Sequence, residues 1–198
     1  MKKIFFICSF FLILGCAKNF DKSNISEVSP PPTAKIEGKH AIFISKENFN
    51  QINRIKSEEC ESWAVKLNFE KPIKKSIENL VYKMFKDFEI VDQKLEKEKI
   101  ERSGFVSQIS FYDFKGNSKF ETIRNTGMYQ ITLDIEIQVS NSSKSVTNDI
   151  SSSMNWEKNI FLNCNLQSGA VKSGQKALEN LIERIYETTY ESIFQLKR

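Results

Sequence analysis

The stretch Tyr129-Gln-Ile-Thr-Leu-Asp-Ile-Glu-Ile-Gln-Val-Ser140 alternates apolar and polar residues over its whole length. Successive side chains of a β-strand point to opposite faces, so this stretch predicts a strand with one buried face and one wet face. An antiparallel sheet that is covered on one side only produces this pattern. The stretch therefore predicts a half-covered antiparallel sheet as the centre of the fold.

The residues that follow extend this sheet. Segment 141–145 is polar and predicts a turn. Beyond it, Ile150, Met154 and Trp156 occupy alternate positions, which predicts a return strand and hence a meander. The outward face of the central strand carries Gln130, Thr132, Glu136 and Gln138. This polar face is interpreted either as simply solvated or as a surface that docks a partner.

Further strands are predicted before the central one, at 41–44, 89–91 and 105–114. In a regular strand, Phe111 and Phe114 would lie on opposite faces. The stretch 105–114 is therefore interpreted either as a central strand, flanked by the loop around Trp63, or as a hydrophobic patch for a partner. The segment 46–71 is polar and irregular, and no strand or helix is predicted within it.

Two long amphipathic helices are predicted, the first beginning at Pro72 and the second following Gly169 and Gly174. The apolar face of the first helix consists of Ile73, Ile77, Leu80, Val81, Met84, Phe85 and Phe88. The buried stripe of the second consists of Ala177, Leu178, Leu181, Ile182, Ile185 and Tyr186, extended by Tyr190, Ile193 and Phe194. The order of elements predicts the α+β class, as a two-layer sandwich: a mostly antiparallel sheet with two helices packed on one face.

The N-terminal segment has the features of a secretion signal. Lys2 and Lys3 precede an apolar run over 4–14. The run is shorter than the roughly 20 apolar residues that a membrane-spanning helix needs. The stretch Leu12-Ile-Leu-Gly-Cys16 resembles the lipobox of bacterial lipoproteins.

This resemblance implies a signal peptide at 1–15 and a lipid-bearing Cys16 that anchors the mature chain in a membrane. Ala17 after the cysteine implies the outer membrane, facing the periplasm, rather than the inner membrane. Residues 16–37 include Pro30-Pro-Pro32 and are predicted to form a lipidated, flexible tether. Residues 38–198 are predicted to form a single periplasmic α+β domain.

Two cysteines remain in the mature domain, Cys60 and Cys164. Because the periplasm is oxidising, we expect them to form a disulfide. Two buried free thiols are the alternative.

Catalytic and cofactor motifs are not found in the sequence. His40 is the single histidine, which leaves no zinc-ligand spacing, and there is no phosphate loop or nucleophile elbow. We therefore predict neither an enzyme nor a cofactor, although a carboxylate pair for glycoside chemistry stays an open alternative. The net charge of +4 does not favour nucleic-acid binding.

The order of elements in 40–196, behind a lipobox, resembles two groups of envelope proteins. One is the small lipoprotein that plugs the lipopolysaccharide-insertion barrel, and the other is the auxiliary lipoproteins of phospholipid-transport ABC systems. No functional residue is matched. The resemblance implies an accessory or assembly subunit that binds an envelope protein partner. The alternative is a transport accessory protein that binds lipid or lipopolysaccharide.

A basic cluster is the one candidate contact site in the folded part. Lys71, Lys74 and Lys75 lie at the start of the first predicted helix, where a cation opposes the helix dipole. This placement suggests contact with an anion or a partner.

Overall fold

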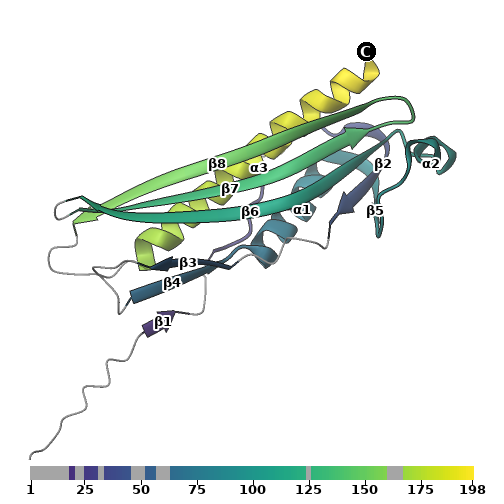
Figure 1. Ribbon diagram of the computed structural model, residues 1–198. Helices are drawn as coiled ribbons and strands as arrows, with labels where there is room; N and C mark the ends of the chain where they lie inside the picture. The colour runs from purple at the N-terminus through teal and green to yellow at the C-terminus, as the bar shows by residue number, and fades with distance from the viewer. Residues whose placement is uncertain are drawn as a thin grey trace, which may run out of the picture.

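The structure is a computed structural model that describes residues 18–20, 25–30, 34–45, 52–56, 63–123, 126–159 and 167–198. The large sheet has the strand order β5-β2-β6-β7-β8, and the small sheet has the order β1-β4-β3 (Figure 1). The strands are β1 (Lys18–Phe20), β2 (Ile36–Ile44), β3 (Ile52–Lys56), β4 (Trp63–Asn68), β5 (Phe85–Val91), β6 (Ser107–Ile123), β7 (Thr126–Ser140) and β8 (Ser145–Asn159). The helices are α1 (Glu70–Met84), α2 (Lys97–Arg102) and α3 (Gln167–Lys197).

The predicted α+β class is confirmed, and the long strands β6, β7 and β8 form the predicted antiparallel meander. The sheet as a whole is mixed, because β2 runs parallel to both of its neighbours, β5 and β6. A parallel pair needs a crossover connection, and α1 provides it between β2 and β5. Within the described residues, no helix combines the length and the apolarity needed to cross a membrane.

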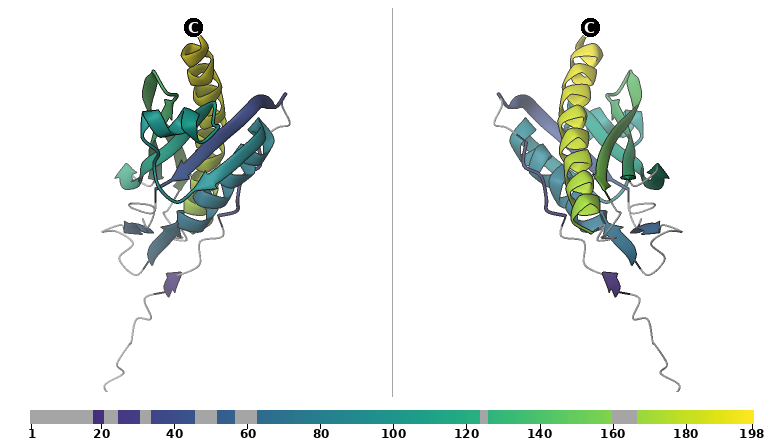
Figure 2. Two further views of the ribbon diagram at one scale, coloured as in Figure 1. Left: turned by 90° about the vertical axis from the view of Figure 1, so that its right-hand side faces the viewer. Right: turned by 90° about the vertical axis from the view of Figure 1, so that its left-hand side faces the viewer.

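β7 has the alternating burial that its sequence predicts. Tyr129, Ile131, Leu133, Ile135 and Ile137 are buried, whereas the side chains that alternate with them are partly or wholly exposed. α3 runs along the inner face of β7 and β8, and both side views place the long strands on one side of this helix (Figure 2). The buried faces of β7 and α3 therefore form about half of one hydrophobic core.

A β-bulge in β6 changes the interpretation of its aromatic residues. Tyr112 pairs with Glu136 and Lys115 pairs with Asp134, so that Asp113 and Phe114 together oppose one residue of β7. Asp113 has a φ of 45°, in the left-handed region that Asp tolerates better than most residues. Because the bulge adds one residue, Phe111 and Phe114 both face the main core. The opposite face also carries an aromatic residue, Tyr112, whose ring lies 5.7 Å from that of Phe43, so aromatic residues are found on both faces as predicted.

The opposite face of the sheet is covered at one end by α2. Ala41 and Ile42 are consecutive in β2 and belong to different clusters, so these clusters lie on opposite faces of the sheet. Ile100 of α2 and Phe105 pack with Ala41. The prediction of helices on one face therefore omitted α2.

α1 begins at Glu70 and ends at Met84, so it is shorter than predicted. Its predicted apolar face is buried as far as Met84. Phe85 and Phe88 lie instead in β5, where the backbone pairs with β2. The apolar spacing continued past the helix end because both residues also pack against the main core.

α3 begins at Gln167, so Gly169 and Gly174 lie inside the helix rather than before it. A Cβ atom on Gly174 would lie 3.0 Å from Ile25 Cδ1 and 3.1 Å from Phe69 Cζ. A Cβ atom on Gly169 would overlap the ring of Trp156. These glycines are therefore explained by close packing and not by a break in the helix.

The N-terminal part of the chain is more ordered than the sequence predicts. β3 and β4 lie in the segment predicted to be irregular, and β1 lies in the predicted tether. Ile25 is 7% exposed within the main core, and the Val28 N–H donates to Ser76 Oγ at 2.8 Å. The folded unit therefore includes residues that precede the predicted boundary at 38.

Candidate functional site

Of the residues predicted to carry function, the cysteines lie outside the described residues. This concerns the lipid attachment at Cys16 and the disulfide between Cys60 and Cys164. Their roles remain predictions from the sequence.

The basic cluster on α1 is largely engaged in ion pairs. Lys74 Nζ lies 3.4 Å from Glu70, one turn earlier, and Lys75 Nζ lies 2.8 Å from Glu27. The hydrogen bond and the charge of Glu27 raise the pKa of Lys75. The side chain of Lys71 is exposed. The acidic partners of Lys74 and Lys75 offset their charge, so the structure does not bring the three lysines together as an open anion site.

The outward face of β6, β7 and β8 is polar, and its side chains bond to one another. Gln130 Nε2 and Thr132 Oγ1 donate to Ser153 Oγ at 3.3 and 3.2 Å, and Gln138 Nε2 donates to Thr147 Oγ1 at 3.1 Å. Such cross-strand pairs stabilise a sheet without any partner. This face is therefore explained by solvation, one of the two interpretations of the sequence.

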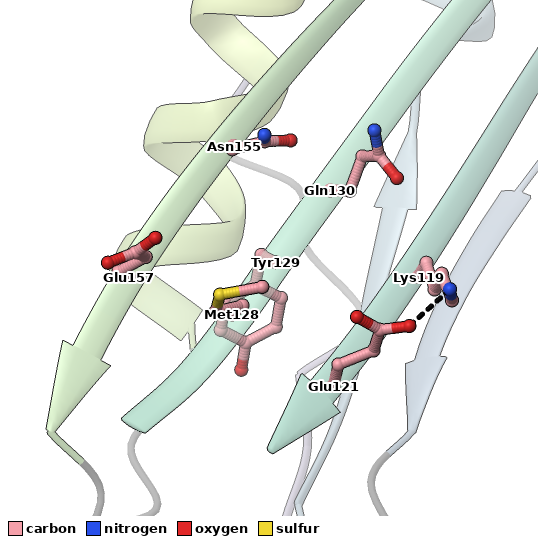
Figure 3. Close-up of a pocket in the computed structure, with 7 residues that line it drawn as sticks. All are labelled: Lys119, Glu121, Met128, Tyr129, Gln130, Asn155 and Glu157. Carbon is pink, nitrogen blue, oxygen red and sulfur yellow. Dashed lines mark ion pairs between the residues drawn. The ribbon is translucent and has the colours of Figure 1, made fainter. Parts of the chain in front are cut away.

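Figure 3 shows a hollow on this outward face, near the end of β6 and the start of β7. It has a volume of about 90 Å³, and its rim includes an ion pair between Lys119 and Glu121. Its lining consists of Lys119, Glu121, Met128, Tyr129, Gln130, Asn155 and Glu157. The hollow is small and most of the residues around it are polar or charged, so it is suited to a few water molecules rather than to a lipid chain.

Aromatic residues form a row on the C-terminal half of α3 that begins partly buried against the core and ends exposed. Tyr186, Tyr190 and Phe194 are spaced by four residues and therefore lie on one face of the helix. The ring centroids are 6.1 Å apart for Tyr186 and Tyr190 and 4.9 Å apart for Tyr190 and Phe194. Phe194 is 51% exposed. We call these three residues the C-terminal aromatic stripe.

Basic groups and a hollow adjoin this stripe. Lys197 Nζ lies 5.9 Å from the centre of the Phe194 ring. A hollow of about 350 Å³ lies beside it, lined by Tyr190, Glu191, Phe194, Gln195 and Arg198. Exposed aromatic rings beside arginine are typical of the residues that contribute most to protein–protein binding.

The sequence pattern assigned the stripe to the buried face of the helix. That assignment holds for Ile185 and Ile193, which are buried, and in part for Tyr186 and Tyr190, which pack against the main core. It does not hold for Phe194. Tyr186, Tyr190 and Phe194 form a second helical repeat with a spacing of four residues. This repeat is offset by one residue from the buried repeat that contains Ile185 and Ile193. This offset is the signal that could have identified the stripe.

His40 is fully buried and has a structural role. Its Nε2 lies 3.2 Å from the carbonyl oxygen of Glu37, which can only accept, so Nε2 carries the hydrogen. Nδ1 then accepts from Ser107 Oγ at 2.9 Å, and the ring packs on Phe85 at 4.7 Å. Burial lowers the pKa of His40, and the smaller effect of the Glu37 hydrogen bond opposes this.

Stability is expected to fall as the pH falls through the range below about 6.5, the ordinary pKa of histidine. The unfolded chain takes up the proton there, whereas folded His40 resists it, so the unfolded state binds more protons. The unfolding free energy should drop by up to about 1.4 kcal/mol per pH unit from this group. Urea unfolding at about pH 7.5 and about pH 5.5 measures it.

The control for this prediction is His40→Gln, which keeps a donor and an acceptor but does not titrate. Its pH dependence should be flatter than that of the wild type. An equal slope in both proteins would contradict the assignment to His40.

No metal centre is found among the residues that the structure describes. Within these ranges, no group of three or more His, Cys, Asp and Glu side chains is placed to hold an ion.

No protein-family model matches this chain, and no curated protein matches it in sequence. Solved structures align with it at low identity. The minor lipoprotein from Acinetobacter baumannii covers 77% of this chain and 90% of its own, with 3% identity and a TM-score of 0.45. Rare lipoprotein B from Shewanella oneidensis covers 81% and 99%, with 11% identity and a TM-score of 0.49.

The hypothetical protein CT253 from Chlamydia trachomatis covers 80% of this chain and 98% of its own, with 10% identity and a TM-score of 0.46. At these identities and scores, the similarities transfer no function and no site residue to this chain.

Proposed function

We propose that this protein is an accessory lipoprotein of the bacterial envelope that binds a protein partner through the C-terminal aromatic stripe. It is anchored by a lipid on Cys16 in the outer membrane and faces the periplasm. The proposal includes no catalytic step and no cofactor. The observation that carries it is the row of Tyr186, Tyr190 and Phe194, in which the two tyrosines pack partly on the core and Phe194 stands half exposed beside Arg198.

The composition of the stripe supports a protein partner. A large aromatic ring that is half exposed contributes little to the stability of the isolated domain. It contributes strongly to binding when a partner excludes water from it. By contrast, the polar groups of the outward sheet face already bond to one another. A partner that covered that face would therefore gain less binding free energy than one that covered the stripe.

The alternative function, lipid binding, needs an apolar cleft between the helices and the sheet. The side chains at that interface include Ile77, Ile137, Leu181 and Ile185, and all four are fully buried in one core cluster. A lipid chain would have to displace them. The described part of the structure therefore favours the protein-binding function.

Phe194→Ala is expected to weaken binding of the partner by about tenfold or more, because a central aromatic contact typically contributes over about 1.4 kcal/mol. The melting temperature should change little, since the ring is half exposed. A photo-crosslinking amino acid at Gln195, placed in the full chain in its native cells, should give a discrete product that Phe194→Ala diminishes. Purified partner and lipoprotein then give the affinity.

The matched control is Tyr82→Ala on α1. Tyr82 is also an exposed aromatic residue, 61% exposed, and its ring lies 4.9 Å from that of Phe88, the same centroid distance as between Phe194 and Tyr190. This change should leave the crosslink and the affinity unaltered. A crosslink that forms from Gln130 on the sheet face, and not from Gln195, would show that the stripe is the wrong surface.

A further inference from the structure

We infer that the small sheet β1-β4-β3 lies against the membrane surface and that the short chain between Cys16 and β1 holds it there. The inference rests on the lipidation of Cys16 in the proposed function. The surface that the small sheet contacts is a bilayer that contains anionic phospholipid.

The length of chain before the structure is the first argument. β1 begins at Lys18, two residues after Cys16, and pairs in parallel with β4 from the register Lys18↔Trp63. Two residues reach at most about 7 Å. A lipid on Cys16 therefore places the small sheet within about one strand's width of the headgroups.

The segment that follows β1 is also fixed to the domain. The chain after β1 therefore provides no slack that would let the domain move away from the membrane. Ile25 packs against Gly174, near the start of α3, and against Phe69, just before α1. Lys83 Nζ donates to the carbonyl oxygen of Pro30. From Cys16 to Ile25 the chain spans at most about 30 Å. The contacts of Ile25 place the N-terminal ends of α1 and α3 at the same end of the molecule as the small sheet, and the contact of Pro30 shows that the chain then runs along α1 toward its C-terminal end.

The aromatic stripe lies at the other end. α3 has 31 residues and is therefore about 46 Å long. Its C-terminus and β1 lie at opposite ends of the molecule in every view (Figures 1 and 2). With the small sheet on the membrane, the stripe faces away from it, toward partners in the periplasm.

The composition of the three strands suits an anionic surface. They contain Lys18, Arg54, Lys56 and Lys66 and no acidic residue, and Arg54 is the register partner of Lys66. Basic residues near anionic headgroups each contribute about 1 kcal/mol to membrane attraction. Glu58, Glu59 and Glu61, between β3 and β4, lie outside the described residues.

The test uses the full lipidated chain in vesicles of phosphatidylethanolamine and phosphatidylglycerol. It is compared with a variant that carries a flexible Gly/Ser linker after Ala17, which leaves the lipobox and the residue after the cysteine intact. Amide hydrogen exchange is measured on both proteins. We expect slower exchange in β3 and β4 of the wild type than of the variant, and equal exchange in the C-terminal half of α3.

Equal exchange of β3 and β4 in the two proteins, or protection of the C-terminal end of α3 instead, would overturn the inference. Both proteins must also sediment with the vesicles. If neither sediments, the lipid anchor itself is contradicted, which separates that failure from a wrong orientation. In vesicles of phosphatidylcholine alone, the protection should decrease, and undiminished protection would contradict the part played by the basic residues.

Discussion

Deletion of Lys115 is expected to destabilise the fold by at least about 3–5 kcal/mol, the cost of removing a phenylalanine from a core. The bulge before it sets which face each residue of β6 occupies. Without Lys115, the residues that follow it in β6 keep their buried or exposed positions only if the bulge is lost. Phe114 then turns to solvent and the carboxylate of Asp113 turns into the core, which adds a desolvation cost. Urea unfolding measures the loss.

The matched control is deletion of Asp113, two residues away. That change removes the extra residue of the bulge and leaves a regular alternation in which Phe111 and Phe114 both face the core. We expect a much smaller loss of unfolding free energy than for deletion of Lys115. Equal losses for the two deletions would show that the shorter chain, and not the face of the sheet on which each side chain lies, determines the effect.

Gly169→Ala is expected to lower the unfolding free energy by about 1–3 kcal/mol, the usual cost of an overpacked site. A new methyl group would overlap the Trp156 ring, which also packs on Tyr129 at 5.5 Å between centroids. To accommodate the methyl group, the first turn of α3 and the end of β8 must move apart. The preference of alanine over glycine in a helix, about 1 kcal/mol, opposes this cost but does not remove the overlap.

A double-mutant cycle tests the reason for this loss. Trp156→Leu should relieve the overlap, so Gly169→Ala should cost less in that background than in the wild type. Ser168→Ala, at an exposed neighbouring position, reports the effect of helix propensity alone. If Gly169→Ala has the same cost with Trp156 and with Leu at that position, the contact with the ring is not its cause.

Elements whose residues alternate or repeat regularly were predictable from the sequence. β7 has a strict period of two, and the apolar face of α1 has a helical period, because each buries one face against a single core. β3 and β4 carry no such pattern, and their pairing with each other is not encoded in either segment alone. Gly169 shows a related limit, because the residue that explains it, Trp156, belongs to a different element.

The candidate site was less predictable than the fold. The sequence directed attention to Lys71, Lys74 and Lys75, but the partner Glu27 comes from a segment that was expected to be a free tether. The whole aromatic stripe was assigned to the core, because its residues lie beside buried isoleucines in the sequence, but only Tyr186 and Tyr190 pack on the core and Phe194 does not. Tyrosine and phenylalanine are compatible with both environments, so only the rotation of α3 on the sheet separates them.

The position of β2 in the sheet has a consequence for biogenesis. β2 is the first strand of the large sheet to leave the ribosome, yet it lies between β5 and β6, which are made later. Until Ser107 and the residues after it are available, β2 can satisfy at most one edge, and Ala41 and Ile42, buried in the fold, remain exposed. Pairing over such separations is slow and favours aggregation. Newly made chains are therefore expected to be prone to aggregation until β6 has been made, and a holding chaperone would protect them in that interval.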